Sequence, residues 1–119
     1  MAEIKRMLKP KIMLEENAAN FNQLVHEGKA PDLSCQNLSD LDLRAFNLTN
    51  ANLSGCYLRG ANLSGLDLSG ANLEGASIKN AFISGVLFPR SLPACEISLS
   101  HQLGIRMRQT KVDLEKPKE

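Results

Sequence analysis

The chain has 119 residues, with 14 basic and 13 acidic side chains and a formal net charge of +1. This length bounds the protein to a single domain, and the balanced charge excludes the strong positive field by which many proteins attract nucleic acid. No run approaches the roughly 20 apolar residues that a membrane span needs, so we expect neither nucleic acid nor a membrane as a partner.

The first element in chain order is an N-terminal segment, residues 1–30, with a predicted capping helix over 14–28. Apolar residues at helical spacing form one stripe of this helix, and Gly28 is placed to end it. The stripe consists of Leu14, Ala18, Phe21, Leu24 and Val25. Because the segment lacks the apolar stretch of about 7–15 residues that marks a secretory signal, we expect a cytoplasmic protein.

Residues 31–90 repeat with a period of five. A large apolar residue occupies the central position of twelve consecutive units without a slip. These residues are Leu33, Leu38, Leu43, Leu48, Leu53, Leu58, Leu63, Leu68, Leu73, Ile78, Ile83 and Phe88. A period of five matches neither an α-helix, at about 3.6, nor a strand, at about 2. It indicates a chain that runs briefly extended and then turns a corner, once per unit.

The other positions of the unit support this interpretation. Two residues before the central residue, half of the units have a small residue, Ala or Cys, which shares its side of an extended segment. Two residues after it stand mostly Gly or Asn, which tolerate positive φ at a corner. The immediate neighbours are mostly Asn, Asp, Ser or Thr and are predicted to point outward. Each unit therefore sends one small and one large apolar side chain into the predicted core.

The sequence Ala-Asn-Leu-Ser-Gly, which stands at both 51–55 and 61–65, resembles the A(D/N)LXX signature of the pentapeptide-repeat family. The resemblance implies an all-β solenoid: a right-handed quadrilateral β-helix with four units per coil, and so about three coils over 31–90. One observation supports four units per coil independently. Four bulky residues, Leu41 among them, stand where six other units have a small one. Three of the four lie at a spacing of twenty, so that they would stack on one face. They are Phe46, Leu66 and Val86.

At the C-terminal end, Phe82 and Leu87 stand at outward positions where most earlier units carry Asn or Asp. An exposed apolar pair needs a cover, and we expect it from a helix over 93–103 within a C-terminal capping segment, 91–108. The apolar stripe of this helix comprises Cys95, Leu99 and Leu103. A homodimer through the outer side of this end is also expected. Residues 109–119 are polar and charged and are predicted to be a disordered tail.

One outward surface stands out. With four units per coil, residues twenty apart share a face, which brings Tyr57, Arg59 and Lys79 together. Tyr and Arg are enriched among the residues that dominate binding energy, so these three form our candidate interaction surface. The alternative is that they are ordinary exposed side chains of a surface without a partner.

No catalytic or metal-binding constellation is visible. The two histidines, His26 and His101, fall in the two predicted caps at opposite ends of the rod, out of reach of the serines on its sides. Cys35, Cys56 and Cys95 are odd in number and widely spaced, which fits neither a disulfide framework nor a zinc site. Cys56 replaces the small residue of its unit and is expected in the core. We expect no enzyme, no cofactor and no metal.

These observations favour a non-catalytic protein-interaction or scaffolding module with a protein partner of unknown identity. The resemblance implies one alternative, a DNA-mimicking modulator of a type II topoisomerase of the quinolone-resistance kind. Such mimicry requires a long and strongly acidic rod, because duplex DNA carries one charge per about 1.7 Å. Residues 31–90 hold five acidic and four basic side chains, so the alternative is disfavoured.

Overall fold

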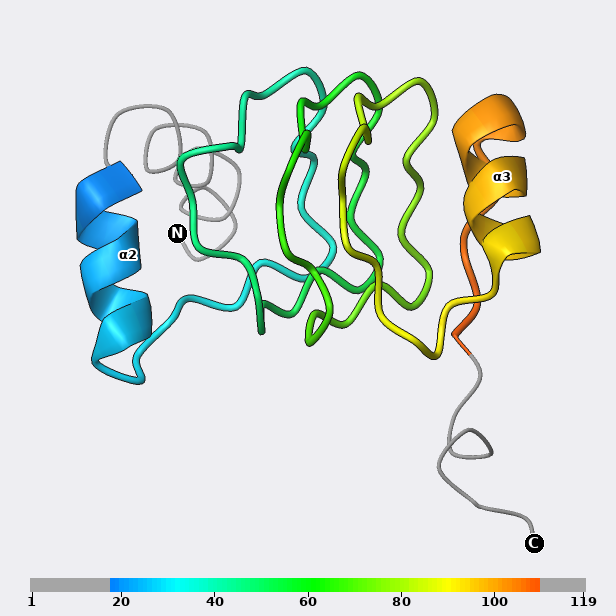
Figure 1. Ribbon diagram of the computed structural model, residues 1–119. Helices are drawn as coiled ribbons and strands as arrows, with labels where there is room; N and C mark the ends of the chain where they lie inside the picture. The colour runs from blue at the N-terminus through cyan, green and yellow to red at the C-terminus, as the bar shows by residue number, and fades with distance from the viewer. Residues whose placement is uncertain (1–17, 110–119) are drawn as a thin grey trace, which may run out of the picture.

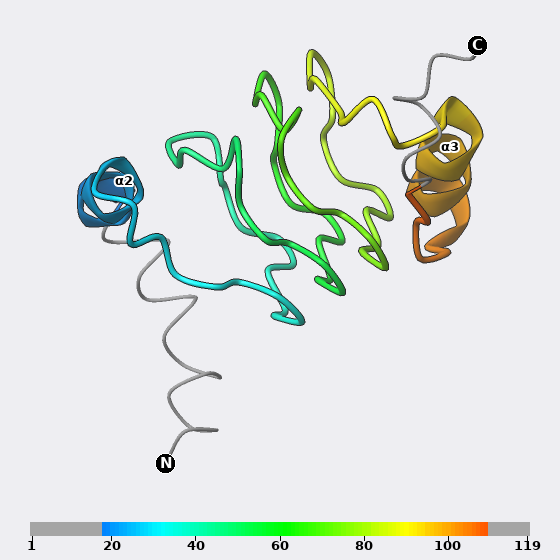
Figure 2. The ribbon, with the colours of Figure 1, turned by 90° about the horizontal axis from the view of Figure 1, so that it is seen from below.

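The computed structural model describes residues 18–109; residues 1–17 and 110–119 lie outside it, and with them the start of the predicted N-terminal helix and nearly all of the predicted tail. Two helices flank a stack of turns. Helix α2, Ala18–His26, lies at one end and helix α3, Ala94–Leu103, at the other (Figure 1). Figure 2, from below, shows the turns following one another between the helices.

A glycine with a positive φ follows each helix, as predicted for Gly28. Gly28, with a φ of +77°, follows α2, and Gly104, with a φ of +81°, caps α3. The Gly104 amide donates to the carbonyl of Ser100 at 2.8 Å, a bond that uses one of the free carbonyls at the helix end. Helix α3 begins one residue later than predicted, after Pro93. Neither described helix is long and apolar enough to cross a membrane.

The core follows the five-residue period. The ten central residues from Leu33 to Ile78 are at most 2% exposed, while Ile83 and Phe88 are partly buried. The small residues two positions earlier also point inward, and Cys56, Ala61 and Ala76 are fully buried in the same cluster. The predicted inward-facing positions are therefore confirmed for these residues.

Backbone hydrogen bonds join each turn to the one twenty residues later. Parallel bridges link Asn37 with Tyr57 and Tyr57 with Ser77, and four more pairs have the same separation. The amide of Leu53 donates to the carbonyl of Asn72 at 2.8 Å, which is the predicted register. Each contact is a single bridge, because a corner interrupts the extended backbone within a few residues.

The corners use positive φ, as the composition predicted. At a representative corner the Cys56 amide donates to the Leu53 carbonyl at 3.1 Å, closing a tight turn. The residue before Cys56 is Gly55, with a φ of +70°. Asp40 and Asn80 take positive φ at the same position in other units; their short polar side chains tolerate it better than most.

The outward Asn and Asp side chains have a structural role that the pattern alone does not reveal. The side-chain oxygen of Asn62 accepts the amide N–H of Ser64 at 3.1 Å. The same bond to the amide two residues on is made by Asp32, Asn37, Asp42, Asn47, Asn52, Asp67 and Asn72. This Asx turn supplies an acceptor for an amide that has no other in the stack.

Helix α2 covers the first turn of the stack. Phe21, 2% exposed, packs edge-on against Phe46, with ring centroids 5.4 Å apart. On the same helix, the side chain of Asn22 donates to the Ala45 carbonyl at 2.9 Å and accepts the Asn47 amide at 2.7 Å. The helix thus provides apolar cover and hydrogen-bond partners together, which is what the exposed end of a stack of turns needs.

At the other end, helix α3 and the strap that follows it, residues 104–109, cover the last turn and supply hydrogen-bond acceptors to it. Between the turns, an amide such as that of Leu58 donates to a backbone carbonyl of the next turn, here Ser77 at 2.8 Å. The last turn has no next turn, and the cap supplies the acceptors instead. The bonds run from the amides of Leu73, Gly75, Ile78 and Asn80 to Gln109 Oε1, Met107 O, Ser100 Oγ and His101 O respectively.

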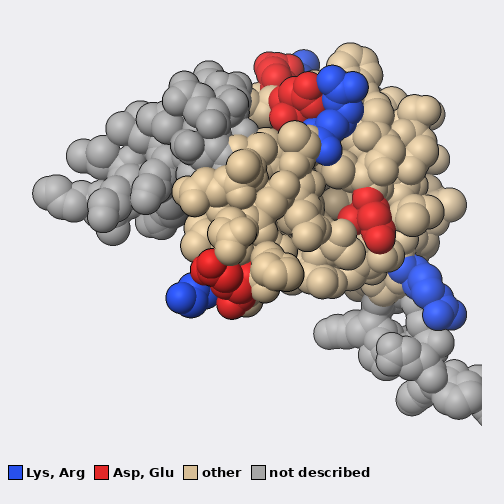
Figure 3. Space-filling view, turned by 60° about the vertical axis from the view of Figure 1, so that its left-hand side comes forward, with Lys and Arg blue, Asp and Glu red and all other residues tan. Residues whose placement is uncertain are grey.

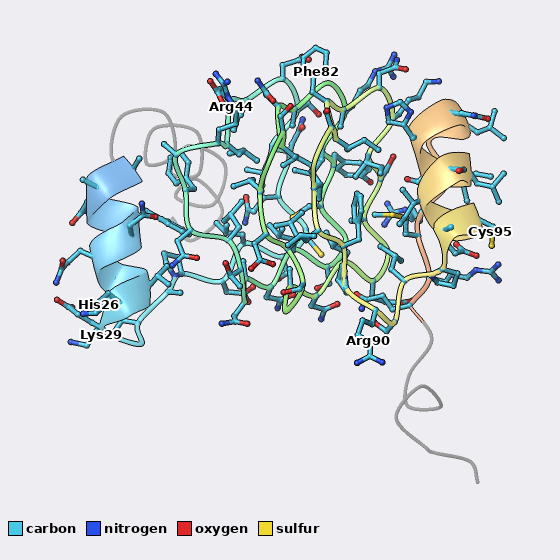
Figure 4. The ribbon with its side chains drawn as sticks, viewed as in Figure 1. His26, Lys29, Arg44, Phe82, Arg90 and Cys95 are labelled. Atoms are coloured by element: carbon cyan, nitrogen blue, oxygen red, sulfur yellow. The ribbon has the colours of Figure 1, made fainter. Side chains whose placement is uncertain are left out.

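The prediction that α3 covers Phe82 and Leu87 is wrong. These side chains are 59% and 58% exposed, because they keep the outward orientation of their positions while the cap pairs with residues 73–80. Phe82 stands on the outer edge of the turns (Figure 4).

The predicted stripe of α3 also faces the other way. Leu99 and Leu103 are 40% and 62% exposed and Cys95 is exposed, whereas the buried residues of the helix are Glu96 and Ser100. The last turn of the stack presents amides that no further turn pairs, so polar residues of α3 face it.

Candidate interaction surface

Tyr57 is the centre of the predicted surface, and the structure gives it a neighbour that the sequence did not. Tyr57 is 45% exposed on the middle turn. The guanidinium of Arg106, in the strap, donates to the Tyr57 hydroxyl and lies 5.2 Å from the centroid of its ring. The same guanidinium donates weakly to the Gly75 carbonyl at 3.4 Å. Arg106 is therefore held in place by three contacts to the stack.

Lys79 and Arg59 flank this pair on neighbouring turns. The Gly60 amide donates to the Lys79 carbonyl at 3.0 Å, so the backbone after Arg59 is paired with the Lys79 unit. The Lys79 ammonium donates to the Gln102 carbonyl at the end of α3, at 3.0 Å. Arg59 is exposed. The three predicted residues thus share one side of the stack, and with Arg106 they form what we call the Tyr57 patch.

Arg106 was missed because it lies outside the repeat, 49 residues from its partner Tyr57. No periodic signal links the two. What could have hinted at it is Ser77, the small residue stacked next to Tyr57, which is buried and donates to the Gly104 carbonyl at 3.0 Å. A small outward side chain there leaves room for the strap to cross.

Charges elsewhere on the described surface are few. On the face shown in Figure 3, basic and acidic side chains lie next to each other at the top and at the lower left, and one acidic and one basic group stand apart. The ion pairs among the described residues join Arg44 to Asp42 and Arg108 to Glu96, each at 2.8 Å. Hydrogen bonds from Arg44 hold the pKa of Asp42 down, to about 2. The cations of the Tyr57 patch belong to neither pair.

The edge near Phe82 and Leu87 differs from the capped edge. In the described structure the amides of Ile83, Gly85 and Phe88 make no hydrogen bond, whereas the equivalent amides one turn earlier donate to the next turn. The cap therefore pairs with only part of the last turn.

The histidines and cysteines are placed apart. His26 lies in α2, and the His101 Nε2 lies 2.9 Å from the Ala81 carbonyl, in a contact that belongs to the cap. The Cys56 thiol donates to the Leu33 carbonyl at 2.9 Å, and burial raises its pKa to about 11. The residues from 18 to 109 contain no group of three or more His, Cys, Asp or Glu that could hold a metal ion.

Comparison with known proteins agrees with the repeat. A family model described as pentapeptide repeats, in eight copies, matches residues 37–75 and 51–88. Searches of curated proteins and of solved structures found no match. Pentapeptide repeats imply a right-handed β-helix in general, and the parallel bridges at a spacing of twenty fit that fold. Through residues 37–88, the chain belongs to the pentapeptide-repeat family.

Proposed function

We propose that this protein is a non-catalytic, cytoplasmic protein-interaction or scaffolding module, and that residues 31–90 are a quadrilateral β-helix of three coils that presents the Tyr57 patch to a protein partner. The observation that carries the proposal is the contact between Tyr57 and Arg106, an exposed aromatic ring with a guanidinium fixed against it. Tyr and Arg together are typical of the anchors of protein interfaces.

The support for a binding role is the rigidity of the backbone beneath the patch. The Tyr57 amide donates to the Gln36 carbonyl at 3.0 Å, and the Tyr57 carbonyl accepts the Leu38 amide at 2.8 Å. Both bonds are part of the ladder of the stack, so Tyr57 is held on each side of its Cα. A partner that binds here orders little of the chain, and this lowers the entropic cost of association.

Affinity capture from extracts of the source cells tests the proposal. The bait is the intact chain, compared with a Tyr57→Ala, Arg59→Ala double variant and with an Arg90→Ala control. Arg90 is exposed at the end of the last unit, outside the patch as defined, and Figure 4 shows it at the lower edge of the turns. We expect one protein to be retained by the intact chain and the control and lost from the double variant. Identical capture by all three baits contradicts the proposal.

A homodimer through the C-terminal end is a second proposal, supported by a separate observation. Phe82 and Leu87 are largely exposed beside amides without a partner, those of Ile83 and Phe88. Both features favour burial against another chain. Sedimentation of the full-length chain decides: we expect a mass that doubles with concentration and that Leu87→Asp keeps near the monomer value of 13.0 kDa. A mass that stays monomeric at all concentrations removes the dimer.

The topoisomerase alternative gains no support from the surface. A DNA mimic needs rows of carboxylates, and the best-defined patch of this protein is cationic. We therefore keep the interaction module as the proposed function.

A further inference from the structure

The cations of the Tyr57 patch lack carboxylate partners. Among residues 18–109 no ion pair includes Arg59, Lys79 or Arg106. Lys79 and Arg106 donate to backbone carbonyls and to the Tyr57 hydroxyl, all uncharged acceptors. Three positive charges therefore lie on one side of a chain with net charge +1, and none of them is neutralised by an ion pair.

Arg106 is also oriented to receive an anion. A guanidinium has five N–H donors in a rigid plane. The hydrogen bonds of Arg106 go to Tyr57 and Gly75, and they involve both terminal nitrogens. Two of the five N–H groups are used in these bonds, so three donors remain on an exposed side chain whose guanidinium is already held by the contact with the Tyr57 ring. Such preorganisation lowers the cost of forming a bidentate pair with a carboxylate.

We propose that the Tyr57 patch binds a short acidic segment of a partner protein. Carboxylates of the segment pair with Arg59, Lys79 and Arg106, and an apolar side chain of the segment lies against the exposed part of the Tyr57 ring. This inference rests on the proposed function and adds to it the chemistry of the partner: charge complementarity selects an acidic peptide.

A nucleic acid fits the same surface less well. Nucleic-acid binding depends on many phosphate contacts along an extended basic track, and this patch is bounded by acidic residues. Asp40 pairs through its backbone with Arg59, whose carbonyl accepts the Asp40 amide at 2.8 Å. On the other side Glu74 precedes Gly75, and its carboxylate accepts the Gln109 amide at 2.7 Å. A short acidic segment can bind between Asp40 and Glu74, whereas a long polyanion would extend over these carboxylates and be repelled by them.

The test uses the full-length chain and two fluorescein-labelled peptides, one of alternating Glu and Leu flanked by Gly-Ser and one with Gln in place of each Glu. Fluorescence anisotropy measures the affinity of each peptide, and NMR chemical-shift changes of the backbone amides locate the binding site. We expect the Glu peptide to bind, to shift the amides of Tyr57, Arg59 and Arg106, and to weaken as salt shortens the Debye length. The Gln peptide should bind at least several-fold more weakly.

Two variants locate the charge. Arg59→Gln removes a cation whose side chain makes no hydrogen bond or ion pair in the described structure, so it leaves the fold intact. We expect it to weaken the Glu peptide about two- to fivefold, the range for one exposed charge pair. Arg90→Gln removes the same charge from outside the patch and should have no effect.

Three results overturn the inference. These are equal binding of the two peptides, an Arg59→Gln variant that binds as the parent does, and a single-stranded oligouridylate that binds more tightly than the Glu peptide, which would make the patch a nucleic-acid site. Each can occur while affinity capture still retains a protein through Tyr57. Failure of the acidic-partner inference is therefore distinct from failure of the interaction module.

Discussion

The hydroxyl of Ser100 accepts the amide N–H of Ile78 at 3.0 Å, where each earlier turn uses a backbone carbonyl of the next one. Ser100 is fully buried. In earlier turns, the acceptor is a carbonyl of the following turn. Because no turn follows the last one, a side chain of α3 supplies the acceptor there.

Ser100→Ala should therefore destabilise the protein, because the Ile78 amide stays buried without an acceptor. The expected loss in free energy of unfolding is about 1–3 kcal/mol. Urea unfolding followed by circular dichroism measures it. The matched control is Ser98→Ala, on the exposed face of the same helix, which should change stability by less than about 0.5 kcal/mol. Equal effects of the two variants would show that the hydrogen bond contributes nothing.

Leu63 tests the core. It is fully buried in the middle turn, so Leu63→Ala removes apolar contacts above and below and leaves a cavity. A buried Leu→Ala change costs about 2–5 kcal/mol, and we expect a value near the middle of that range. Leu103→Ala, at a position 62% exposed, is the control and should be nearly neutral in the same urea titration. A Leu63→Ala variant as stable as the control contradicts the inward assignment.

Asn62 tests the Asx turn. From its outward position alone Asn62→Ala is expected to cost less than about 0.5 kcal/mol, but the bond from the Ser64 amide raises the expectation to about 0.5–1.5 kcal/mol. Asn62→Asp keeps the acceptor, as Asp67 does in the next unit, and should remain within about 0.5 kcal/mol of the parent. Thermal unfolding of both variants separates the two effects. If Ala and Asp are equivalent there, the acceptor is not what the position requires.

The repeat could be predicted from the sequence because its information is local and periodic. Leu63 is one of the large apolar residues that recur at every fifth position, and this recurrence predicts that it is buried. Gly55 stands two residues after a central residue, where a glycine predicts a corner. The caps follow no period. For α3, the expectation that a helix buries its apolar stripe was wrong. Leu99 and Leu103 were expected inside because helices usually bury apolar residues. The last turn of the stack instead presents backbone amides, and the Ser100 hydroxyl accepts a hydrogen bond from one of them, that of Ile78.

For the same reason, only the part of the candidate surface that lies within the repeat could be predicted from the sequence. A spacing of twenty brings Tyr57, Arg59 and Lys79 to one side, since the stack has that register. Arg106 reaches the patch only because Gly104 turns the chain back, with a φ of +81°, and the strap pairs with Gly75 through the Met107 carbonyl. Neither event leaves a pattern in the sequence.

The last prediction concerns acid stability and the pair that fixes the strap to α3. Glu96 accepts two side-chain hydrogen bonds and one backbone hydrogen bond from Arg108. These bonds, the side-chain ones first, hold the pKa of Glu96 below its usual value. A carboxyl group with a lowered pKa in the folded state stabilises that state fully at pH above its unfolded pKa, about 4.3. The contribution is lost as pH falls through the lower, folded value.

Glu96→Gln should therefore lower stability at neutral pH. The difference from the parent should shrink as pH falls from the unfolded pKa of about 4.3 through the lower pKa that Glu96 has in the folded parent. Comparing the two proteins is essential, because Asp42 also has a lowered pKa and adds to the acid sensitivity of both. Thermal unfolding from pH 7 down to pH 2.5 gives the difference curve. A difference that stays constant over that range would mean that the Glu96 charge does not hold the strap, and that its packing alone does.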